Sequence, residues 1–187
     1  ARNCFLQPAW LDIINSHSWR LSKPIRIPGR IRERMIAKKR DRQAEKDKKI
    51  RETVKFSILM PVYNVEPCWL EKAVASVKEQ NYKNWELCIV DDASTHSEVK
   101  DYLSKICDKS IIIKFLEKNE GISNATNTAA EMADGDYILL MDHDDELAGD
   151  ALYEFAKCIM ENHPDVVYSD QDIIDTKGNH SCPLYKP

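Results

Sequence analysis

The sequence predicts an α/β fold in which a mostly parallel sheet is flanked by helices. Strand-like and helix-like segments alternate with short loops from residue 54 to residue 167. This alternation is typical of parallel strands joined by crossover helices on both faces of a sheet. With 187 residues and 43% hydrophobic content, the chain is long enough to bury the core of one such domain.

Five short apolar segments are predicted to be strands. The first is Val54–Met60, which we expect to stop at Pro61, and the second is Glu86–Val90. Ile111–Phe115 is the third. Tyr137–Met141 is almost wholly apolar, which is typical of a central strand that is buried on both faces. Val166–Tyr168 is the fifth predicted strand.

The helices between these strands are predicted from apolar residues at helical spacing. The four expected stripes are Leu70, Ala73, Val74 and Val77; Val99, Tyr102, Leu103, Ile106 and Cys107; the small residues of 122–133; and Leu152, Phe155, Ala156, Ile159 and Met160. Each stripe gives its helix one face that can pack on the sheet.

Residues 1–53 form a separate predicted segment, a basic helical arm or linker that precedes the domain at 54–187. Lys23 to Arg51 contains thirteen Lys or Arg and four acidic residues, a net +9 that leaves −13 on the rest of the chain. Ile31–Lys49 has helix-forming composition with few apolar anchors. We interpret it as a solvated linker, with peripheral contact to an anionic membrane as the alternative.

The acidic body argues against nucleic acid as the main partner, because phosphate binding requires basic faces. Its carboxylates suit divalent cations better. The six cysteines form no C-x-x-C pair, and the sequence shows neither a signal-peptide core nor an apolar run of about 18 residues. We therefore expect a cytoplasmic protein with free thiols.

Three predicted strands are followed by polar residues that should meet at one edge of the sheet. They are Pro61-Val62-Tyr63-Asn64, Asp91-Asp92-Ala93-Ser94 and Asp142-His143-Asp144-Asp145. The chain has five glycines and no glycine-rich phosphate loop. A cation held by the acidic cluster could instead bridge to diphosphate oxygens and neutralise charge on a departing diphosphate. The alternative is a solvated acidic turn.

Two further side chains at these ends could recognise a nucleobase. Tyr63 offers a flat face for stacking, and Asp92 could accept a hydrogen bond from a pyrimidine ring NH. The alternatives are a packing role for Tyr63 and a helix cap at Asp92. The five histidines show no spacing typical of a zinc site.

Four motifs, taken in order, resemble family 2 glycosyltransferases of the GT-A type, whose sheet is Rossmann-like. They are Ser57-Ile-Leu-Met-Pro-Val-Tyr-Asn64, Val90-Asp-Asp-Ala-Ser94, Asn119-Glu-Gly-Ile-Ser123 and Asp142-His-Asp-Asp145. The resemblance covers about Phe56 to Pro187. The later segments Tyr168-Ser-Asp-Gln-Asp172, Lys177-Gly178 and Tyr185-Lys186-Pro187 are similar to members that build bacterial surface polysaccharides.

The resemblance implies a metal-dependent, inverting transfer of sugar from a nucleotide-diphosphate donor, a UDP-sugar above all, to a glycan or lipid-linked acceptor. By residue, it places Pro61 and Tyr63 in the base pocket, Asp92 on the base, Asp144 on Mn²⁺ or Mg²⁺, and Asp142 near the ribose or the metal. Asn127 would face the donor.

The resemblance also leaves gaps. Thr126 stands where many relatives have Arg, so a diphosphate contact would be missing or come from elsewhere. In similar enzymes the catalytic base lies in an acceptor-binding half, which we expect downstream of Pro187. Asp170 and Asp172 are interpreted as donor-side loop residues. A non-catalytic nucleotide-sugar-binding module and a receiver-type phosphorylation domain are the alternative functions.

Overall fold

A computed structural model describes residues 33, 36–41, 44–45, 49–50, 54–176 and 178–186. The chain divides into two compact units, residues 1–45 and residues 46–187. Most of the predicted basic arm lies outside the described residues, although residues 36–41 are helical as expected. The predicted domain boundary after residue 53 also falls outside them. Among the described residues, no helix combines the length and the apolar composition needed to cross a bilayer.

The second unit is built on a four-stranded, fully parallel sheet with the order β3-β2-β1-β4. Its strands are β1 (Phe56–Val62), β2 (Trp85–Asp91), β3 (Ile111–Phe115) and β4 (Tyr137–Leu140). The connections are α4 (Pro67–Lys78), α5 (Ser97–Ser104) and α6 (Ile122–Met132), and α7 (Ala151–Asn162) follows β4. The predicted α/β class is confirmed.

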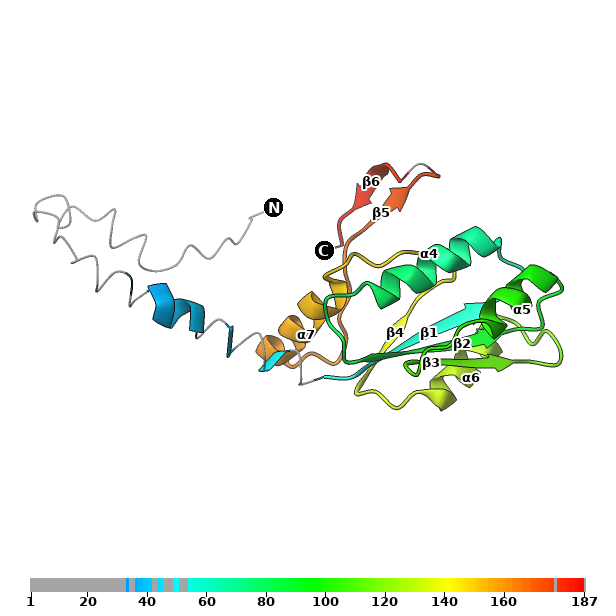
Figure 1. Ribbon diagram of the computed structural model, residues 1–187, viewed down its shortest axis with the longest axis horizontal. Coiled ribbons are helices and arrows are strands. Elements are labelled where there is room, and N and C mark those ends of the chain that lie inside the picture. The colour runs from blue at the N-terminus through cyan, green and yellow to red at the C-terminus, as the bar shows by residue number, and fades with distance from the viewer. Residues whose placement is uncertain are drawn as a thin grey trace, which may run out of the picture. The chain divides into compact units, whose positions relative to one another are not determined.

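Helices cover both faces of the sheet, with α4 and α5 on one side and α6 on the other (Figure 1). Alternate residues of β1 divide between two cores. Phe56, Ile58 and Met60 pack in the larger core, which also holds the predicted apolar stripes of α4 and α7. Leu59 packs with Cys88 and the small residues of α6 in the smaller one. The predicted faces of α4, α6 and α7 therefore pack in these cores. The predicted stripe of the second helix is correct only in part, because α5 ends at Ser104 and Cys107 beyond it is exposed.

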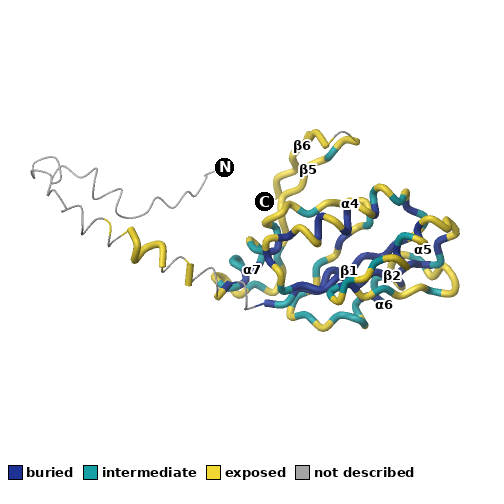
Figure 2. Tube along the Cα trace, in the orientation of Figure 1, coloured by how far each residue is buried: buried dark blue, intermediate teal, exposed yellow. Residues whose placement is uncertain are grey.

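The position of β4 corrects one prediction, because β4 lies at the edge of the sheet and not at its centre. Every residue of β1 and β2 is buried, and both appear as continuous dark segments in Figure 2. In β4, Tyr137 and Leu139 pack against the larger core, whereas Ile138 and Leu140 are 54% and 71% exposed. All four residues of β4 are apolar, but only the face that carries Tyr137 and Leu139 is covered.

β1 runs two residues past its predicted end and includes Pro61. Proline is tolerated in a strand where its missing N–H faces no ladder partner. Pairing of β1 with β4 ends at Leu59↔Leu140, whereas pairing with β2 continues to Val62↔Asp91. Backbone groups of Leu59 and Pro61 face the β4 side, so the missing N–H falls just beyond the end of that ladder.

The predicted strand at Val166–Tyr168 is wrong, because this segment has no regular structure. Val166 is 77% and Tyr168 is 61% exposed, and of the three residues only Val167 packs against the larger core. The chain instead forms a separate antiparallel hairpin of β5 (Gln171–Ile174) and β6 (His180–Leu184). The described residues of both strands are almost wholly exposed (Figure 2).

A buried polar network joins the amino ends of β1, β2 and β4. The Glu86 carboxylate accepts hydrogen bonds from Ser57 Oγ (2.6 Å) and the Asp134 N–H (2.6 Å), and it pairs with Lys55 Nζ (2.6 Å). Gly135 N donates to Ser57 Oγ (2.8 Å). A charge this buried is tolerated because its lone pairs are satisfied. The network fixes the turn that leads into β4 against the start of β1.

We expect Gly135→Ala to lower the free energy of unfolding by about 1–3 kcal/mol, the usual cost of overpacking. A Cβ at this position would lie 2.6 Å from Ser57 Oγ and 2.7 Å from the Lys55 carbonyl oxygen. Urea denaturation followed by circular dichroism measures the change. Gly149→Ala is the matched control, because a Cβ there meets nothing within 4 Å. Equal midpoints for the two variants would contradict the packing described here.

A second prediction concerns the acid stability that Glu86 contributes. Burial opposes ionisation, but hydrogen bonds from Lys55, Ser57 and the Asp134 N–H outweigh it and lower the pKa of Glu86 below 4.5. A lowered folded-state pKa adds stability above the unfolded pKa, and this stability is lost as the pH falls through the folded pKa. The difference in unfolding free energy between the wild type and Glu86→Gln should therefore shrink below a pH of about 4.5.

Urea titrations across the acid range test this prediction. Glu131→Gln, at an exposed position on α6, is the control and should show no such pH-dependent difference. A difference for Glu86→Gln that stays constant down to a pH of about 3 would show that the ionised carboxylate does not contribute in this way.

Candidate functional site

The three polar loops predicted from the sequence all leave the sheet at the carboxyl ends of its strands. β1, β2 and β4 are parallel neighbours, so their carboxyl ends lie together. Pro61–Asn64 ends β1, Asp91–Ser94 ends β2, and Asp142–Asp145 follows β4. In an open parallel sheet this edge is where ligands bind.

Asn64 ties the loop after β1 to the loop after β2. Its side-chain Oδ1 accepts hydrogen bonds from Thr95 N (2.7 Å), Thr95 Oγ1 (3.1 Å) and His96 N (3.3 Å), and its backbone N donates to Ser94 Oγ (3.0 Å). Asn64 has φ +48° and Ala93 has φ +57°. Asn tolerates this left-handed region better than most residues. The side chain and the backbone N–H of Asn64 thus both link the two loops.

Asp92 connects the loop after β2 to the start of α6. Its Oδ1 accepts from Glu120 N (2.7 Å) and its Oδ2 accepts from Gly121 N (2.8 Å), and the residue is only 3% exposed. The neighbouring Asp91 is fully buried and accepts from Ser94 N. These bonds give Asp92 a role in joining the two segments, and the base contact predicted for it stays a prediction.

The other predicted donor-binding residues differ in exposure. Tyr63 is 44% exposed, as a stacking surface requires. Pro61 is buried, and its predicted place in a base pocket stays a prediction. Asn127 is exposed on α6, where Thr126 Oγ1 is engaged with the Ile122 carbonyl (2.8 Å). The contact of Asn127 with a donor stays a prediction.

The acidic turn after β4 presents its carboxylates to solvent. Asp142 and Asp144 are exposed, whereas His143 between them is half-buried and its Nδ1 lies 3.0 Å from the Pro61 carbonyl oxygen. Asp145 N donates to Asp142 O (3.3 Å) and closes the turn. Burial, together with the negative charges of Asp142 and Asp144, raises the pKa of Asp145. A cation would relieve this repulsion.

The donor set fits a hard divalent cation. Within the described part of the chain, no three or more His, Cys, Asp or Glu side chains gather into a group that could hold a metal by themselves. Mg²⁺ and similar ions commonly use one or two carboxylates and complete their shell with substrate phosphates and water. Asp142 and Asp144 match that arrangement, which requires a phosphate-bearing ligand to complete it.

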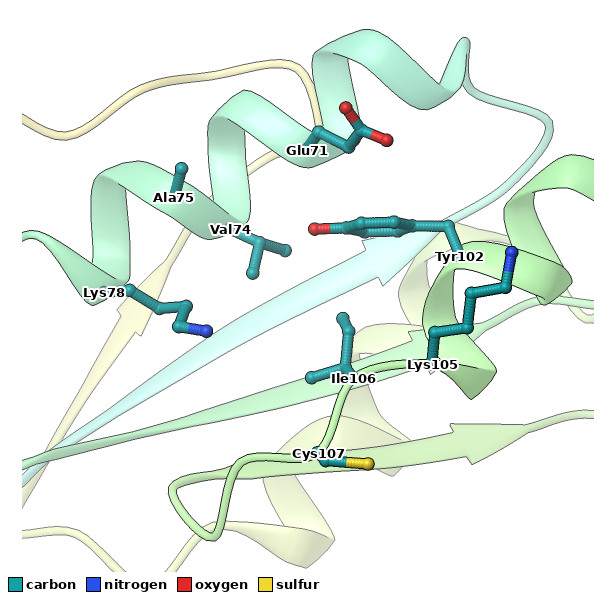
Figure 3. A pocket seen from close by; sticks show the side chains of 8 residues that line it. All are labelled: Glu71, Val74, Ala75, Lys78, Tyr102, Lys105, Ile106 and Cys107. Atoms are coloured by element: carbon teal, nitrogen blue, oxygen red, sulfur yellow. The ribbon is translucent and has the colours of Figure 1, made fainter.

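A groove of about 320 Å³ lies between α4 and the segment from Tyr102 of α5 to Cys107 (Figure 3). It is lined by Glu71, Val74, Ala75, Lys78, Tyr102, Lys105, Ile106 and Cys107. Tyr102 extends from α5 toward α4, and burial followed by the Glu71 charge raises the pKa of its hydroxyl. None of the predicted site residues lines this groove.

Sequence reasoning missed two residues that assemble the site. Asn64 appeared only as the last letter of a motif, and its acceptor role depends on N–H groups about 30 residues away. The spacing of the histidines argues against a zinc site, and nothing local in the sequence indicated that His143 contacts Pro61. The signal that could have indicated the role of Asn64 is the presence of hydroxyl and amide residues beside the carboxylates at the strand ends.

Comparison with known proteins shows a clear family match. Residues 57–185 match the profile of "Glycosyl transferase family 2". An uncharacterized glycosyltransferase of Haemophilus influenzae is 37% identical over 66% of this chain and 50% of its own length. The putative teichuronic acid biosynthesis glycosyltransferase TuaG of Bacillus subtilis is 36% identical over 56% of this chain and 42% of its own length.

Solved structures show the same fold. TarS of S. aureus in complex with UDP-GlcNAc superposes with a TM-score of 0.54 at 28% identity, covering 58% of this chain and 32% of that one. Mannosyltransferase PcManGT from Pyrobaculum calidifontis, in complex with GDP-Man and Mn²⁺, gives 0.51 at 27% identity over 57% and 32%. The expected GT-A type is confirmed. The chain spans half or less of the length of the first curated relatives it matches.

Substitution of Asn64 should separate its two contributions. Asn64→Gly keeps φ +48° accessible but removes the Oδ1 acceptor, and we expect a loss of about 1 kcal/mol in unfolding free energy. Asn64→Ala removes the acceptor and adds backbone strain, for a further loss of about 1 kcal/mol. Chemical denaturation of both variants measures this order. An Ala variant as stable as the Gly variant would contradict the left-handed backbone at this position.

Proposed function

Because the chain belongs to glycosyl transferase family 2, we propose that it binds the donor of a metal-dependent, inverting enzyme that transfers sugar from a nucleotide-diphosphate, a UDP-sugar, to a glycan or lipid-linked acceptor. The observation that carries the proposal is the convergence of three loops at one sheet edge, bearing the exposed Tyr63 and the exposed pair Asp142 and Asp144. Aromatic, acidic and amide groups are the types that base, metal and sugar recognition require.

The nucleoside would bind against the loop after β1. Tyr63 would stack on the base, and Asp92 would accept from a ring NH with the lone pairs left by Glu120 N and Gly121 N. Asn127 would contact the donor from α6. Support for a uridine nucleotide comes from TarS, whose structure contains UDP-GlcNAc. PcManGT was solved with GDP-Man, so the base has to be tested directly.

The diphosphate would bind beside the acidic turn. Asp144, with Asp142, would hold Mn²⁺ or Mg²⁺, and the bound ion would neutralise negative charge on the departing diphosphate. The exposed carboxylates support this, as does the Mn²⁺ in the PcManGT structure. The fixed backbone around the turn would let these groups act without rearrangement.

The acceptor hydroxyl needs a general base, and none of the residues described here is assigned that role. Asp170 accepts from Lys186 N (2.8 Å), and Asp172 pairs with His180 Nδ1 (2.8 Å) in the exposed hairpin. These contacts favour a structural role for both acids. The base and the acceptor site are proposed to belong to the part of the relatives' length that this chain does not span.

A second candidate is a nucleotide-sugar-binding module without transferase activity. The partial coverage of the relatives favours keeping it, because donor binding alone needs only the loops present here. The family match, in contrast, gives no support to a receiver-type domain. Assays of sugar transfer and of donor hydrolysis by the complete gene product distinguish the module from the enzyme.

We expect one of UDP, GDP and dTDP to bind the chain in a Mn²⁺-dependent manner, as measured by titration calorimetry. Asp144→Ala should abolish the increase in affinity that Mn²⁺ produces, because the carboxylate that links protein and metal is removed. Glu131→Ala, at an exposed acidic residue on the last turn of α6, is the control and should bind like the wild type. Metal-independent binding in all three proteins would count against the donor-site assignment.

A further inference from the structure

His143 lies between Asp142 and Asp144 in the sequence. Both aspartates are exposed, whereas His143 is half-buried. Its Nδ1 lies 3.0 Å from the carbonyl oxygen of Pro61. A carbonyl oxygen can only accept, so Nδ1 must carry the hydrogen and donate it. In the neutral ring this leaves Nε2 without a proton, since the hydrogen bond at one nitrogen selects the tautomer.

This bond continues the backbone ladder between β1 and β4. Tyr137 N donates to Lys55 O (3.2 Å), and Met141 N donates to Leu59 O (3.1 Å). In both pairs the donor follows the acceptor by 82 residues, and the same separation of 82 relates His143 to Pro61. The imidazole therefore bonds to the carbonyl that the backbone N–H of residue 143 would reach if β4 continued.

The backbone therefore leaves β4 after Leu140 while the His143 side chain remains bonded to β1. β4 ends at Leu140, and the backbone after Met141 turns with Asp145 N bonded to Asp142 O (3.3 Å). Because the ring of His143 keeps the pairing, the backbone on both sides is free to direct Asp142 and Asp144 outward, where both are exposed. The anchor residue Pro61 lies two residues before Tyr63 in the neighbouring loop.

We propose that His143 is a positioning residue for donor binding, which fixes the metal-binding turn in register with the base-binding loop through its Nδ1–H···O bond to Pro61. This inference rests on the proposed function, since it concerns the relative placement of the groups that would hold the metal and the base. Outer groups that orient a metal site typically alter its affinity by about 10- to 100-fold when they are removed.

Three substitutions test which position on the side chain of residue 143 must carry the hydrogen-bond donor to Pro61 O. In His143→Asn the amide nitrogen is the same number of bonds from the backbone as Nδ1, so it can donate to Pro61 O. In His143→Gln the amide nitrogen is one bond farther and corresponds to Nε2. His143→Ala has no donor. We expect Asn to retain the Mn²⁺-dependent affinity for the nucleoside diphosphate within about threefold, and Gln and Ala to lose about tenfold or more.

The measurement is calorimetry with UDP, GDP and dTDP, with and without Mn²⁺, at a temperature at which circular dichroism shows all variants folded. The metal-free affinity should change much less than the Mn²⁺-dependent one. Equal affinities for the Asn, Gln and Ala variants, with normal binding by the wild type, would overturn the positioning role alone. A wild-type chain without any Mn²⁺-dependent binding would overturn the proposed function and the positioning role with it.

A second readout needs neither metal nor nucleotide. Long-range ¹H–¹⁵N correlation spectra of the metal-free chain should show the neutral His143 ring protonated at Nδ1. A ring protonated at Nε2 would show that the bond to Pro61 does not exist and would overturn the proposal, whatever the nucleotide titrations give.

Discussion

Hydrogen bonding of β1 on both of its edges sets the geometry on which the rest of the domain depends. Its ladder with β2 extends from Phe56↔Trp85 to Val62↔Asp91, whereas its ladder with β4 ends at Leu59↔Leu140. The loops after β1 and β2 therefore leave the sheet at the same level, and pairing with β4 stops three residues earlier along β1. This difference in length places the Pro61 carbonyl beyond the end of the β1–β4 ladder, where the His143 ring donates to it.

The two ends of the sheet treat their charges differently. At the amino end, Glu86 receives donors from Ser57, Lys55 and the Asp134 backbone, so its charge is neutralised inside the protein. At the carboxyl end, Asp142 and Asp144 are exposed, and after desolvation their charges are the next cause of the raised pKa of Asp145. A satisfied network stabilises one edge, and unneutralised carboxylates leave the other edge available to a cation and its ligand. The buried network and the proposed binding site therefore lie at opposite ends of the same strands.

Much of the fold followed from periodicity. The apolar stripe Leu70, Ala73, Val74 and Val77 became the buried face of α4, and Ile111–Phe115 became β3 without change. The strand predictions were wrong where an apolar sequence suggested a strand buried on both faces but the strand is covered on one face only. Tyr137–Leu140 is apolar throughout, yet Ile138 and Leu140 are exposed at the sheet edge, and the apolar Val166 and Tyr168 belong to no strand. Local composition does not record which neighbour covers a given face.

For the site, the sequence by itself determined which chemical groups follow each strand, because strand-end polar residues are visible as breaks in apolar runs. It indicated Tyr63, Asp92, Asp142 and Asp144 as candidates on that basis. Only the tertiary structure decided how they are held. Asp92 is bonded to Glu120 and Gly121, and Asn64 is bonded to Thr95 and His96. These partners lie 28 to 32 residues apart, and His143 and Pro61 lie 82 apart. Such pairs come together only through strand register, which depends on the packing of the whole sheet and leaves no local pattern in the sequence.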